Sequence, residues 1–400
     1  MRLRWDVGLG RDLGLAFWAM TLFEATFGAY MGVWPLWIEE LGAPIAVVGL
    51  VLGSAGFIRP LVIAPSSWLT ERFDRKRLMI AARISGIAGM IVAALAQVWT
   101  ILFITVVLNA IGEVVFPLLQ TYVAERAHEN RARAFSMIIN VGPSMALMIT
   151  PLLSGALIAQ WGMRSAFILG AITGLASILV LSRMDLSLPR EEEDDESAQP
   201  SYRDTFANSP IRSLFAVHGV TILSLAIGIS LIPVFLRDTR GLDPALIATL
   251  GAGSALGTAL FGLAVARTPA LSNFPMRAAA ISCTAIVAGL FVFTIAEALP
   301  LIALAFFLRG GMFATWAMIL AEMGNIAPTR LRSRAFAVVE MLGGSAMSFG
   351  PIIASQLYGI SPSVPILVGA VLGGIMAFVM GWMQWRRSDQ ASTDTTTMPV

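Results

Sequence analysis

The chain has 400 residues, of which 57% are hydrophobic and 13% are charged, and its formal net charge is +2. A soluble protein of this size needs more polar residues to cover its core, so this composition favours a membrane protein. The small net charge argues against nucleic-acid binding, and the single cysteine, Cys283, excludes a disulfide framework and a multi-cysteine metal site.

We predict twelve membrane-spanning helices, because a span needs about 20 mostly apolar residues. The first apolar stretch follows several arginines and is too long for the core of a cleavable signal peptide, so we interpret it as a span. The predicted spans are 13–38, 44–66, 77–97, 99–123, 133–160, 163–184, 211–236, 244–267, 275–297, 299–323, 333–358 and 363–385.

The positions of the basic residues predict the orientation. Most of the 27 Lys and Arg residues lie in alternate connections, including both terminal segments. Because cytoplasmic loops are rich in Lys and Arg, we expect both termini in the cytoplasm and the protein in the plasma or inner membrane.

The longest polar segment, 185–210, contains the run REEEDDESAQPSYRD and reads as a solvated cytoplasmic linker. It separates a predicted six-helix bundle at 1–184 from a second bundle at 211–386, and 387–400 forms a cytoplasmic tail.

The two halves repeat at an offset near 200 residues. RARAFSMIINVGPSMALMITP ends at Pro151 and RSRAFAVVEMLGGSAMSFGP ends at Pro351, while VVLNAIG at 106–112 corresponds to FFLRGG at 306–311. Two pseudo-symmetric bundles of six spans are an architecture of secondary transporters, whose halves rock around a central site. Gly142, Pro143, Pro151, Gly350 and Pro351 lie inside the repeat-related fifth and eleventh spans, where proline permits a kink, and we expect them to form a gate.

A cluster of charges, TERFDRKR at 70–77, lies between the second and third spans. It resembles the signature loop of the major facilitator superfamily, whose pattern is G-x-L-A-D-R-x-G-R-K. The matching positions are Leu69, Arg72, Arg75 and Lys76; Glu71 is a conservative replacement, and Ser67, Thr70 and Asp74 differ. The resemblance implies the superfamily's fold of twelve helices. It also implies a cytoplasmic latch between the halves, formed by Ser67, Glu71, Arg72, Asp74, Arg75 and Lys76, with Glu340 of the eleventh span within reach.

PLLSGALIAQWGMRSAF at 151–167 is similar to the fifth-helix signature of the superfamily's drug/proton antiporters. The resemblance therefore implies proton-coupled efflux of amphipathic compounds. The antiporters often carry an arginine in the fourth span within an R-x-x-x-G pattern. Here that position is Asn109, and an arginine appears at the repeat-related Arg309.

Charged residues are rare inside the predicted spans and mark candidate sites, because a charge at the centre of a span costs about 2.5–3.5 kcal/mol on insertion scales. Glu24, Glu113 and Arg309 lie mid-span, and Asn109 shares a helix face with Glu113. A carboxyl group shielded from water can exchange a proton near neutral pH, as a proton carrier must. The alternative is a structural ion network.

We expect other polar residues within the spans to be structural. Arg83 is predicted to extend towards the cytoplasmic surface, and Arg59 either to do the same or to join the latch. The lone histidine of the seventh span, His218, is able to titrate, but a structural role is the commoner one for such a residue. Four tryptophans are predicted to serve packing or interface anchoring rather than ligand stacking: Trp18, Trp34, Trp37 and Trp316.

The sequence thus predicts a secondary transporter of a small organic solute that acts as a monomer with protons as its coupling ion. An uncoupled or importing transporter of sugars or metabolites remains an alternative, as does a non-transporting sensor on the same fold. An enzyme is not expected: the sequence carries no GxxxxGK[ST] loop and no histidine–carboxylate metal cluster, and it implies no cofactor.

Overall fold

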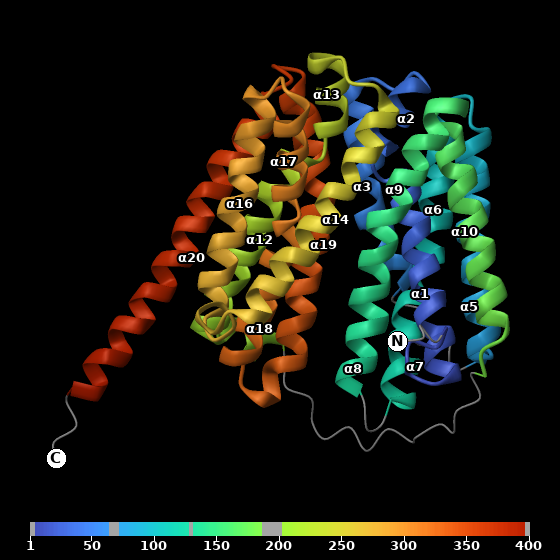
Figure 1. Cartoon of the computed structure of the whole chain (residues 1–400). Coiled ribbons are helices and arrows are strands. Elements are labelled where there is room, and N and C mark those ends of the chain that lie inside the picture. The colour runs from blue at the N-terminus through green and yellow to red at the C-terminus, as the bar shows by residue number, and fades with distance from the viewer. Residues whose placement is uncertain (1–4, 64–71, 128–130, 186–201, 397–400) are drawn as a thin grey trace. The chain divides into compact units, whose positions relative to one another are not determined.

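The computed structural model describes residues 5–63, 72–127, 131–185 and 202–396, and every regular element among them is a helix (Figure 1). Before residue 186 these are α1 (Arg11–Tyr30), α2 (Trp34–Glu40), α3 (Ile45–Ile63), α5 (Arg75–Leu95), η1 (Trp99–Ile101), α6 (Leu102–Gly112), α7 (Val115–Arg126), α8 (Arg131–Phe135), η2 (Ser136–Val141), α9 (Gly142–Trp161) and α10 (Arg164–Ser182). After it come α11 (Tyr202–Ala207), α12 (Ser209–Ile229), α13 (Ile232–Arg240), α14 (Pro244–Arg267), α15 (Pro269–Ser272), α16 (Pro275–Ile295), α17 (Leu299–Arg309), α18 (Gly311–Ile326), α19 (Thr329–Tyr358) and α20 (Val364–Thr396).

Eleven helical stretches among the described residues are long and apolar enough to cross a membrane. They coincide with the second to the twelfth predicted spans. The first predicted span, 13–38, is not among them: α1 carries Glu24 in its middle, which lowers its mean hydropathy. The number twelve therefore stays a prediction.

Two of the predicted spans, 13–38 and 211–236, are each interrupted near their second end. α1 ends at Tyr30 and α2 begins at Trp34, while α12 ends at Ile229 and α13 begins at Ile232. Pro35 and Pro233 occupy the second position of the helices that follow the breaks. Proline has no N–H to donate to the preceding turn but fits a helix start, so the chain restarts there.

The described helices belong to two compact units. One comprises Met1–Glu193 with Pro233–Ala255, and the other comprises Asp194–Ile232 with Leu256–Val400. Residues 233–255 follow the acidic segment in the chain but pack with the first unit. The domain boundaries that we expect from the sequence, 184 and 211, remain predictions.

Helices pack in the same order within each unit. In the first, α1 lies against α9 and α10, and α5 lies against α6 and α10; in the second, α12 lies against α19 and α20, and α16 lies against α17 and α20. α5 begins at residue 75 and α16 at residue 275, which agrees with the repeat offset read from the sequence.

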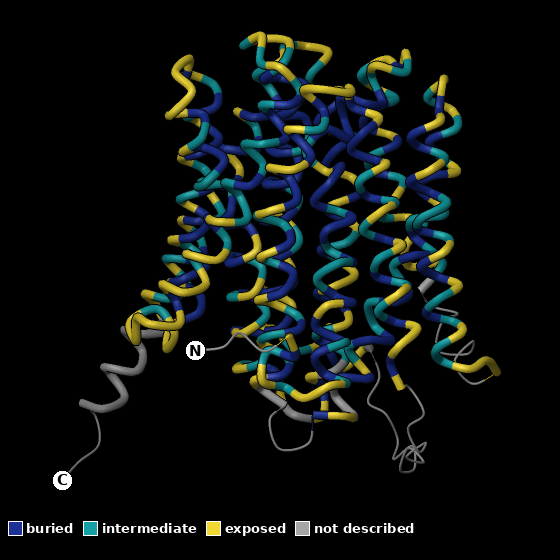
Figure 2. Tube along the Cα trace, turned by 45° about the vertical axis from the view of Figure 1, so that its right-hand side comes forward, coloured by how far each residue is buried: buried dark blue, intermediate teal, exposed yellow. Residues whose placement is uncertain are grey.

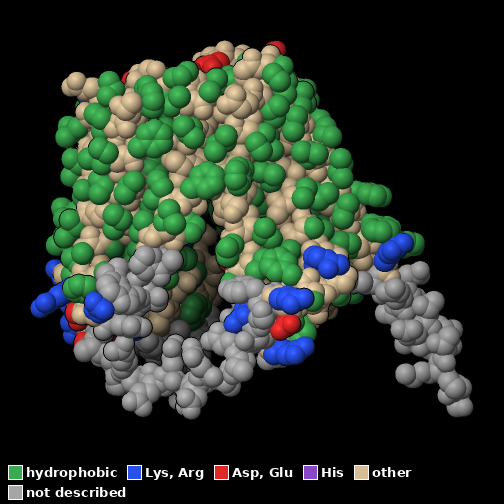
Figure 3. All heavy atoms as spheres, turned by 180° about the vertical axis from the view of Figure 1, so that it is seen from behind, with side chains coloured by type: hydrophobic (Ala, Val, Ile, Leu, Met, Phe, Trp, Pro, Cys, Tyr) green, Lys and Arg blue, Asp and Glu red, His purple; other side chains and the backbone are tan. Residues whose placement is uncertain are grey.

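Both units bury a core of apolar residues and leave other large apolar side chains exposed, and buried and exposed residues alternate along the helices (Figure 2). Phe17, Phe23, Met79, Leu119 and Tyr122 form part of the core of the first unit. Leu61, Ile295 and Phe378, by contrast, are highly exposed. In Figure 3 hydrophobic side chains cover the flanks of the helices, whereas Lys and Arg gather near one end. Such apolar exposure suits contact with lipid.

Candidate functional site

A break between α6 and α7 positions Glu113. The carbonyl of Glu113 lacks its usual donor four residues later because residue 117 is a proline. The N–H of Phe116 donates to it instead at 2.9 Å, and this tighter turn separates the two helices. Glu113 therefore lies at an irregular point of the backbone inside an apolar stretch, as functional residues often do.

Glu113 forms an ion pair with Arg59 of α3. Arg59 Nε lies 2.7 Å from Glu113 Oε2, and the Glu113 side chain is 19% exposed while that of Arg59 is 53% exposed. The sequence predicts that Arg59 extends towards the surface or joins the latch, and it does not predict this pair. The sequence feature that points to this ion pair is the presence of opposite charges at similar depths in the second and fourth predicted spans.

A second pair of charges lies beside the first. Glu24 of α1 is half-buried and interacts electrostatically with Glu113, Arg59 and Arg83. Arg83 of α5 is only 3% exposed, so the expectation that it extends to the surface is wrong. When all four groups are ionised their charges cancel within the first unit.

The Arg83 guanidinium is held by one polar and one aromatic contact. Its Nη2 donates to Thr26 Oγ1 at 3.2 Å, and its Cζ lies 4.7 Å from the centroid of the Phe23 ring. Its Nε has no hydrogen-bond partner among the described residues. The aromatic face and the unused donor leave Arg83 able to bind a further acceptor in the site.

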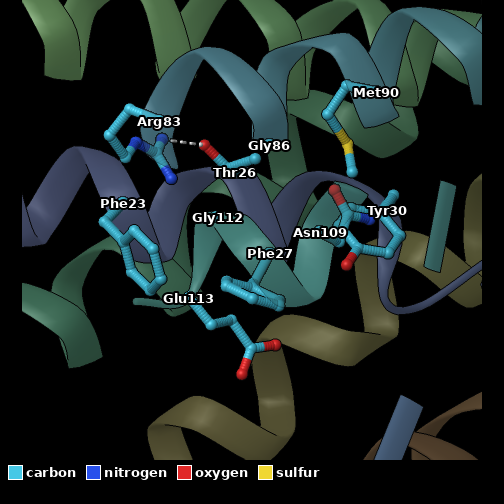
Figure 4. Close-up of a pocket in the computed structure, with 10 residues that line it drawn as sticks. All are labelled: Phe23, Thr26, Phe27, Tyr30, Arg83, Gly86, Met90, Asn109, Gly112 and Glu113. Carbon is cyan, nitrogen blue, oxygen red and sulfur yellow. Dashed lines mark hydrogen bonds between the residues drawn. The ribbon is translucent and has the colours of Figure 1, made fainter. Parts of the chain in front are cut away.

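Two of the four charged residues, Arg83 and Glu113, line a cavity in the first unit (Figure 4). Its volume is about 10 Å³, close to the smallest that holds one water molecule. In Figure 4 Glu113 points away from Arg83, and Asn109 lies at the other end of the cavity near Tyr30. The lining residues are Phe23, Thr26, Phe27, Tyr30, Arg83, Gly86, Met90, Asn109, Gly112 and Glu113.

Glycine makes room for Asn109. A Cβ atom at Gly89 would lie 2.6 Å from Asn109 Oδ1, so only glycine allows α5 to pass this close to the amide. Asn109 and Glu113 line the same cavity, as their shared helix face predicts. The break that follows α6 does not separate them.

Aromatic side chains continue from the cavity. The Tyr30 ring centroid lies 5.7 Å from those of both Trp34 and Phe167, and Trp37 contacts Phe167 at the same distance. Trp37 Nε1 donates to the Ala93 carbonyl at 3.1 Å. Buried and hydrogen-bonded, Trp37 is a packing residue, as the sequence indicates.

Arg309 belongs to the second unit, whereas Glu24, Arg59, Arg83 and Glu113 belong to the first. Arg309 is the last residue of α17, and Gly310 separates it from α18. The tenth predicted span is therefore interrupted at this point, as the fourth predicted span is interrupted between α6 and α7. Among the described residues the side chain of Arg309 makes no hydrogen bond and no ion pair. The structure does not bring Arg309 together with Glu24 or Glu113 in one unit.

Of the signature loop, Ser67 and Glu71 lie outside the described residues. Asp74 caps α5, because its Oδ1 accepts from the Arg77 N–H at 2.9 Å. Lys76 Nζ donates to the Met184 carbonyl at 2.8 Å, beyond the end of α10. Both contacts lie within the first unit and hold the ends of its helices. Arg72 and Arg75 lie at the same end.

Glu340 is exposed on α19 and accepts a hydrogen bond from Trp316 Nε1 of α18 at 3.2 Å. This contact lies within the second unit. The role of Glu340 in a latch therefore stays a prediction.

The predicted gate residues bring helices together. Ser136–Val141 form a π-helical turn directly before Gly142 and Pro143, and Pro151 and Pro351 lie inside α9 and α19. π-turns accommodate an extra residue and often mark functional positions. A Cβ at Gly142 would overlap Thr21 of α1, and a Cβ at Gly350 would overlap Ala226 of α12. In each unit a glycine thus lets the fifth or eleventh span touch the first helix of its repeat.

Residues 16–351 match the family model of the Major Facilitator Superfamily. The chain belongs to this family. It is therefore a transporter and a multi-pass integral membrane protein, and the resemblance seen in the signature loop is confirmed. The family moves small-molecule solutes across membranes and consists of transporters rather than enzymes.

Over 351 residues the chain is 27% identical to a chloramphenicol efflux pump found in two strains of Mycobacterium tuberculosis, and the match covers 84% of this chain and 79% of the pump. The solved nucleoside transporter NupG has a TM-score of 0.73 at 16% identity, covering 93% of this chain and 99% of NupG. A human organic anion transporter has a TM-score of 0.64 at 14% identity, covering 92% and 98%. These two structures show the shared fold.

Proposed function

We propose that this transporter exports small amphipathic organic solutes in exchange for protons by alternating access. The observation that carries the proposal is the set of two carboxylates and two guanidiniums, Glu24, Glu113, Arg59 and Arg83, beside a cavity in the membrane-spanning part of one unit. Ionisable groups in such surroundings are rare and mark ion or substrate pathways. The similarity to a chloramphenicol efflux pump supports export of drug-like compounds.

Glu113 exchanges the coupling proton in this proposal. Ionised, its carboxylate pairs with Arg59; protonated, it loses the ionic part of that contact and Arg59 is released. Glu24 is the second carboxylate and stabilises Arg83 when ionised. Solute binding near Asn109 then competes with the proton, and Arg309 supplies a positive charge to the second unit.

The remaining predictions complete the proposal. The transporter works as a monomer with twelve spans, both termini in the cytoplasm, in the plasma or inner membrane. Residues 1–184 and 211–386 form the two halves that rock, 185–210 link them and 387–400 form the tail. The signature loop and Glu340 hold the cytoplasmic side closed, while Gly142, Pro143, Pro151, Gly350 and Pro351 flex.

Proteoliposomes test the proposal. The purified protein is reconstituted with a pH-sensitive dye inside, and chloramphenicol, lipophilic cations, nucleosides, sugars and organic anions are added separately. We expect one class to trigger proton flux in the wild type. We also expect Glu113→Gln to abolish that flux and Glu24→Gln to reduce it at least about tenfold.

Glu297→Gln is the matched control, because Glu297 is exposed in a connection between helices and should tolerate the same chemical change. Movement of labelled solute without proton flux would favour the uncoupled or importing transporter. Wild-type flux in Glu113→Gln would make that residue structural. Silence with every solute class would favour the non-transporting sensor.

A further inference from the structure

The proposed function leaves unused a buried histidine in the second unit. His218 of α12 is 0% exposed. Neither of its ring nitrogens has a hydrogen-bond partner among the described residues, and the same holds for the hydroxyl of Thr221 on the next turn of α12. The backbone of Val339 approaches the ring without reaching hydrogen-bond geometry. Three unsatisfied polar atoms therefore lie along one side of one helix.

Packing alone does not explain these residues. A neutral imidazole carries one donor and one acceptor, and a hydroxyl carries both. Buried polar groups nearly always have partners, and each exception needs a cause such as a bound water, an ion or a functional role. An apolar side chain would fill the space without leaving polar groups unpaired.

The surroundings fix the imidazole ring in place. The Trp316 ring of α18 meets it edge to face, with centroids 5.1 Å apart and an interplanar angle of 87°. A Cβ atom at Gly343 of α19 would lie 3.0 Å from His218 Nε2 and would overlap the Trp316 ring. Glycine at position 343 thus allows three helices to close around the ring.

A polar contact connects this buried ring to an exposed carboxylate. Trp316 Nε1 donates to Glu340 Oε1 at 3.2 Å, and Glu340 lies one turn before Gly343 on α19. α12 packs against both α18 and α19, which agrees with their neighbouring places in Figure 1. Trp316 therefore touches the buried histidine with its ring and the exposed Glu340 with its N–H.

Other titratable side chains occur on the helices packed against α12. Glu340 is the one hydrogen-bonded to a residue that contacts the imidazole. Glu322 on α18 is a second carboxylate, and it is buried. Among the side chains that the structure describes, the other titratable groups are Arg330, Arg332, Arg334 and Tyr358 on α19, Arg277 and Cys283 on α16, Arg386 on α20, and Arg203 and Asp204 on α11.

We infer that His218 and Thr221 form a second proton-binding site and that Glu340, through its contact with Trp316, connects it to solvent. Trp316 is a positioning residue that contacts the imidazole with its ring and Glu340 with its N–H. In the binding step an O–H bond of hydronium breaks, an N–H bond of His218 forms and a water molecule is left. The inference rests on the proposed proton exchange and adds to it a group in the other unit.

Histidine NMR tests the inference without any transport substrate. The chain has two histidines, so His128→Gln labelled with 15N-histidine reports His218 alone. We expect the ring nitrogens to change reversibly from neutral shifts towards imidazolium shifts as the pH is lowered from about 8. His218→Gln identifies the same resonances in the wild type.

Three further variants separate a proton site from an inert core residue. Glu340→Gln replaces the carboxylate that the Trp316 N–H contacts and should change the titration midpoint of His218. Trp316→Phe keeps an aromatic ring but removes that N–H, and it should change the midpoint as well. Glu297→Gln should leave it unchanged.

Neutral shifts at every pH would overturn the inference, and so would a midpoint that Glu340→Gln and Trp316→Phe leave unchanged. Proton flux in liposomes distinguishes failure of the His218 site from failure of the proposed function. A His218 that never titrates beside normal solute-driven flux removes only the second site. A His218 that titrates with a Glu340-dependent midpoint supports the site even if no solute drives flux.

Discussion

Individual charges in the first unit are placed so that each has an opposite charge nearby. Arg59 contacts Glu113, and Arg83 interacts with Glu24. Removing one member of a pair within an apolar region leaves the other without compensation, which costs more than the pair itself contributes. Because Arg59 is about half exposed, water reduces this cost at the Arg59–Glu113 pair.

A double-mutant cycle on this pair tests the assignment. We expect Arg59→Gln and Glu113→Gln each to lower the free energy of unfolding, and the double variant to lose less than the sum. The coupling should be about 0.5–1.5 kcal/mol, as for a partly exposed pair in contact. Thermal unfolding of the four proteins in one detergent measures it.

Arg77→Gln is the control for this cycle, because Arg77 is exposed at the start of α5. It should show no coupling with Glu113→Gln. Additive losses for Arg59 and Glu113 would mean that their contact contributes nothing in the protein.

The sequence predicts which residues of the site matter better than it predicts their partners. Glu24, Asn109 and Glu113 stand out because polar groups are rare in apolar spans, and all three lie at or beside the charged cluster. Arg59 and Arg83 carry equal charge but lie nearer the ends of their spans, where extension to the surface is the common outcome. Only the packing of α1, α3, α5 and α6 decides that Arg83 is buried and that Arg59 pairs with Glu113.

Among the helices, close approach depends on single glycines. α19 passes α12 at Gly350, where a Cβ would overlap that of Ala226. Gly344 lies on the same helix, and a Cβ there would meet nothing within 4 Å. The two positions share a helix and a residue type but differ in their neighbours, so they form a matched pair.

Gly350→Ala should therefore destabilise the protein by about 1–3 kcal/mol, because the extra methyl group overpacks the α12–α19 contact. Gly344→Ala should be neutral or stabilise by up to about 1 kcal/mol, because alanine favours helix more than glycine does. Thermal unfolding in detergent compares them. Equal effects at both positions would show that helix propensity, rather than contact, governs α19.

Long elements are predictable from the sequence because apolar length decides them, and the second to twelfth spans coincide with helices long enough to cross a membrane. The breaks within the spans cannot be predicted from apolar length, because each break depends on one local hydrogen bond. Pro35 and Pro233 restart helices inside predicted spans, and Pro117 withdraws the donor that Glu113 needs. A proline within an apolar run permits a kink, a break or a new helix start, and the neighbouring turns decide which.

For the whole molecule, the division into units does not follow the order of the chain. Residues 233–255 come after the acidic linker, yet they pack with the first unit. Arg237 of α13 lies 2.8 Å from Glu39 of α2, and these two residues occupy corresponding positions in the two repeats. Gly155 of α9 also lies close to Thr249 of α14. The first unit is thus completed by chain from the second half of the sequence.

A split protein tests whether these contacts hold the halves of the chain together. If the chain is cut between Glu193 and Asp194 and both pieces are co-expressed, we expect them to copurify, because α13 and the start of α14 stay packed on the first piece. Glu39→Arg places two arginines in contact and should weaken copurification about three- to tenfold, in line with about 1 kcal/mol for a partly exposed pair. Exchanging the charges, with Glu39→Arg and Arg237→Glu together, should restore much of it, although Asp238 beside Arg237 then repels the new glutamate.

Glu40→Arg, at the exposed neighbouring position, should leave copurification unchanged. Equal copurification for Glu39→Arg and the wild type would mean that apolar packing alone joins the two pieces.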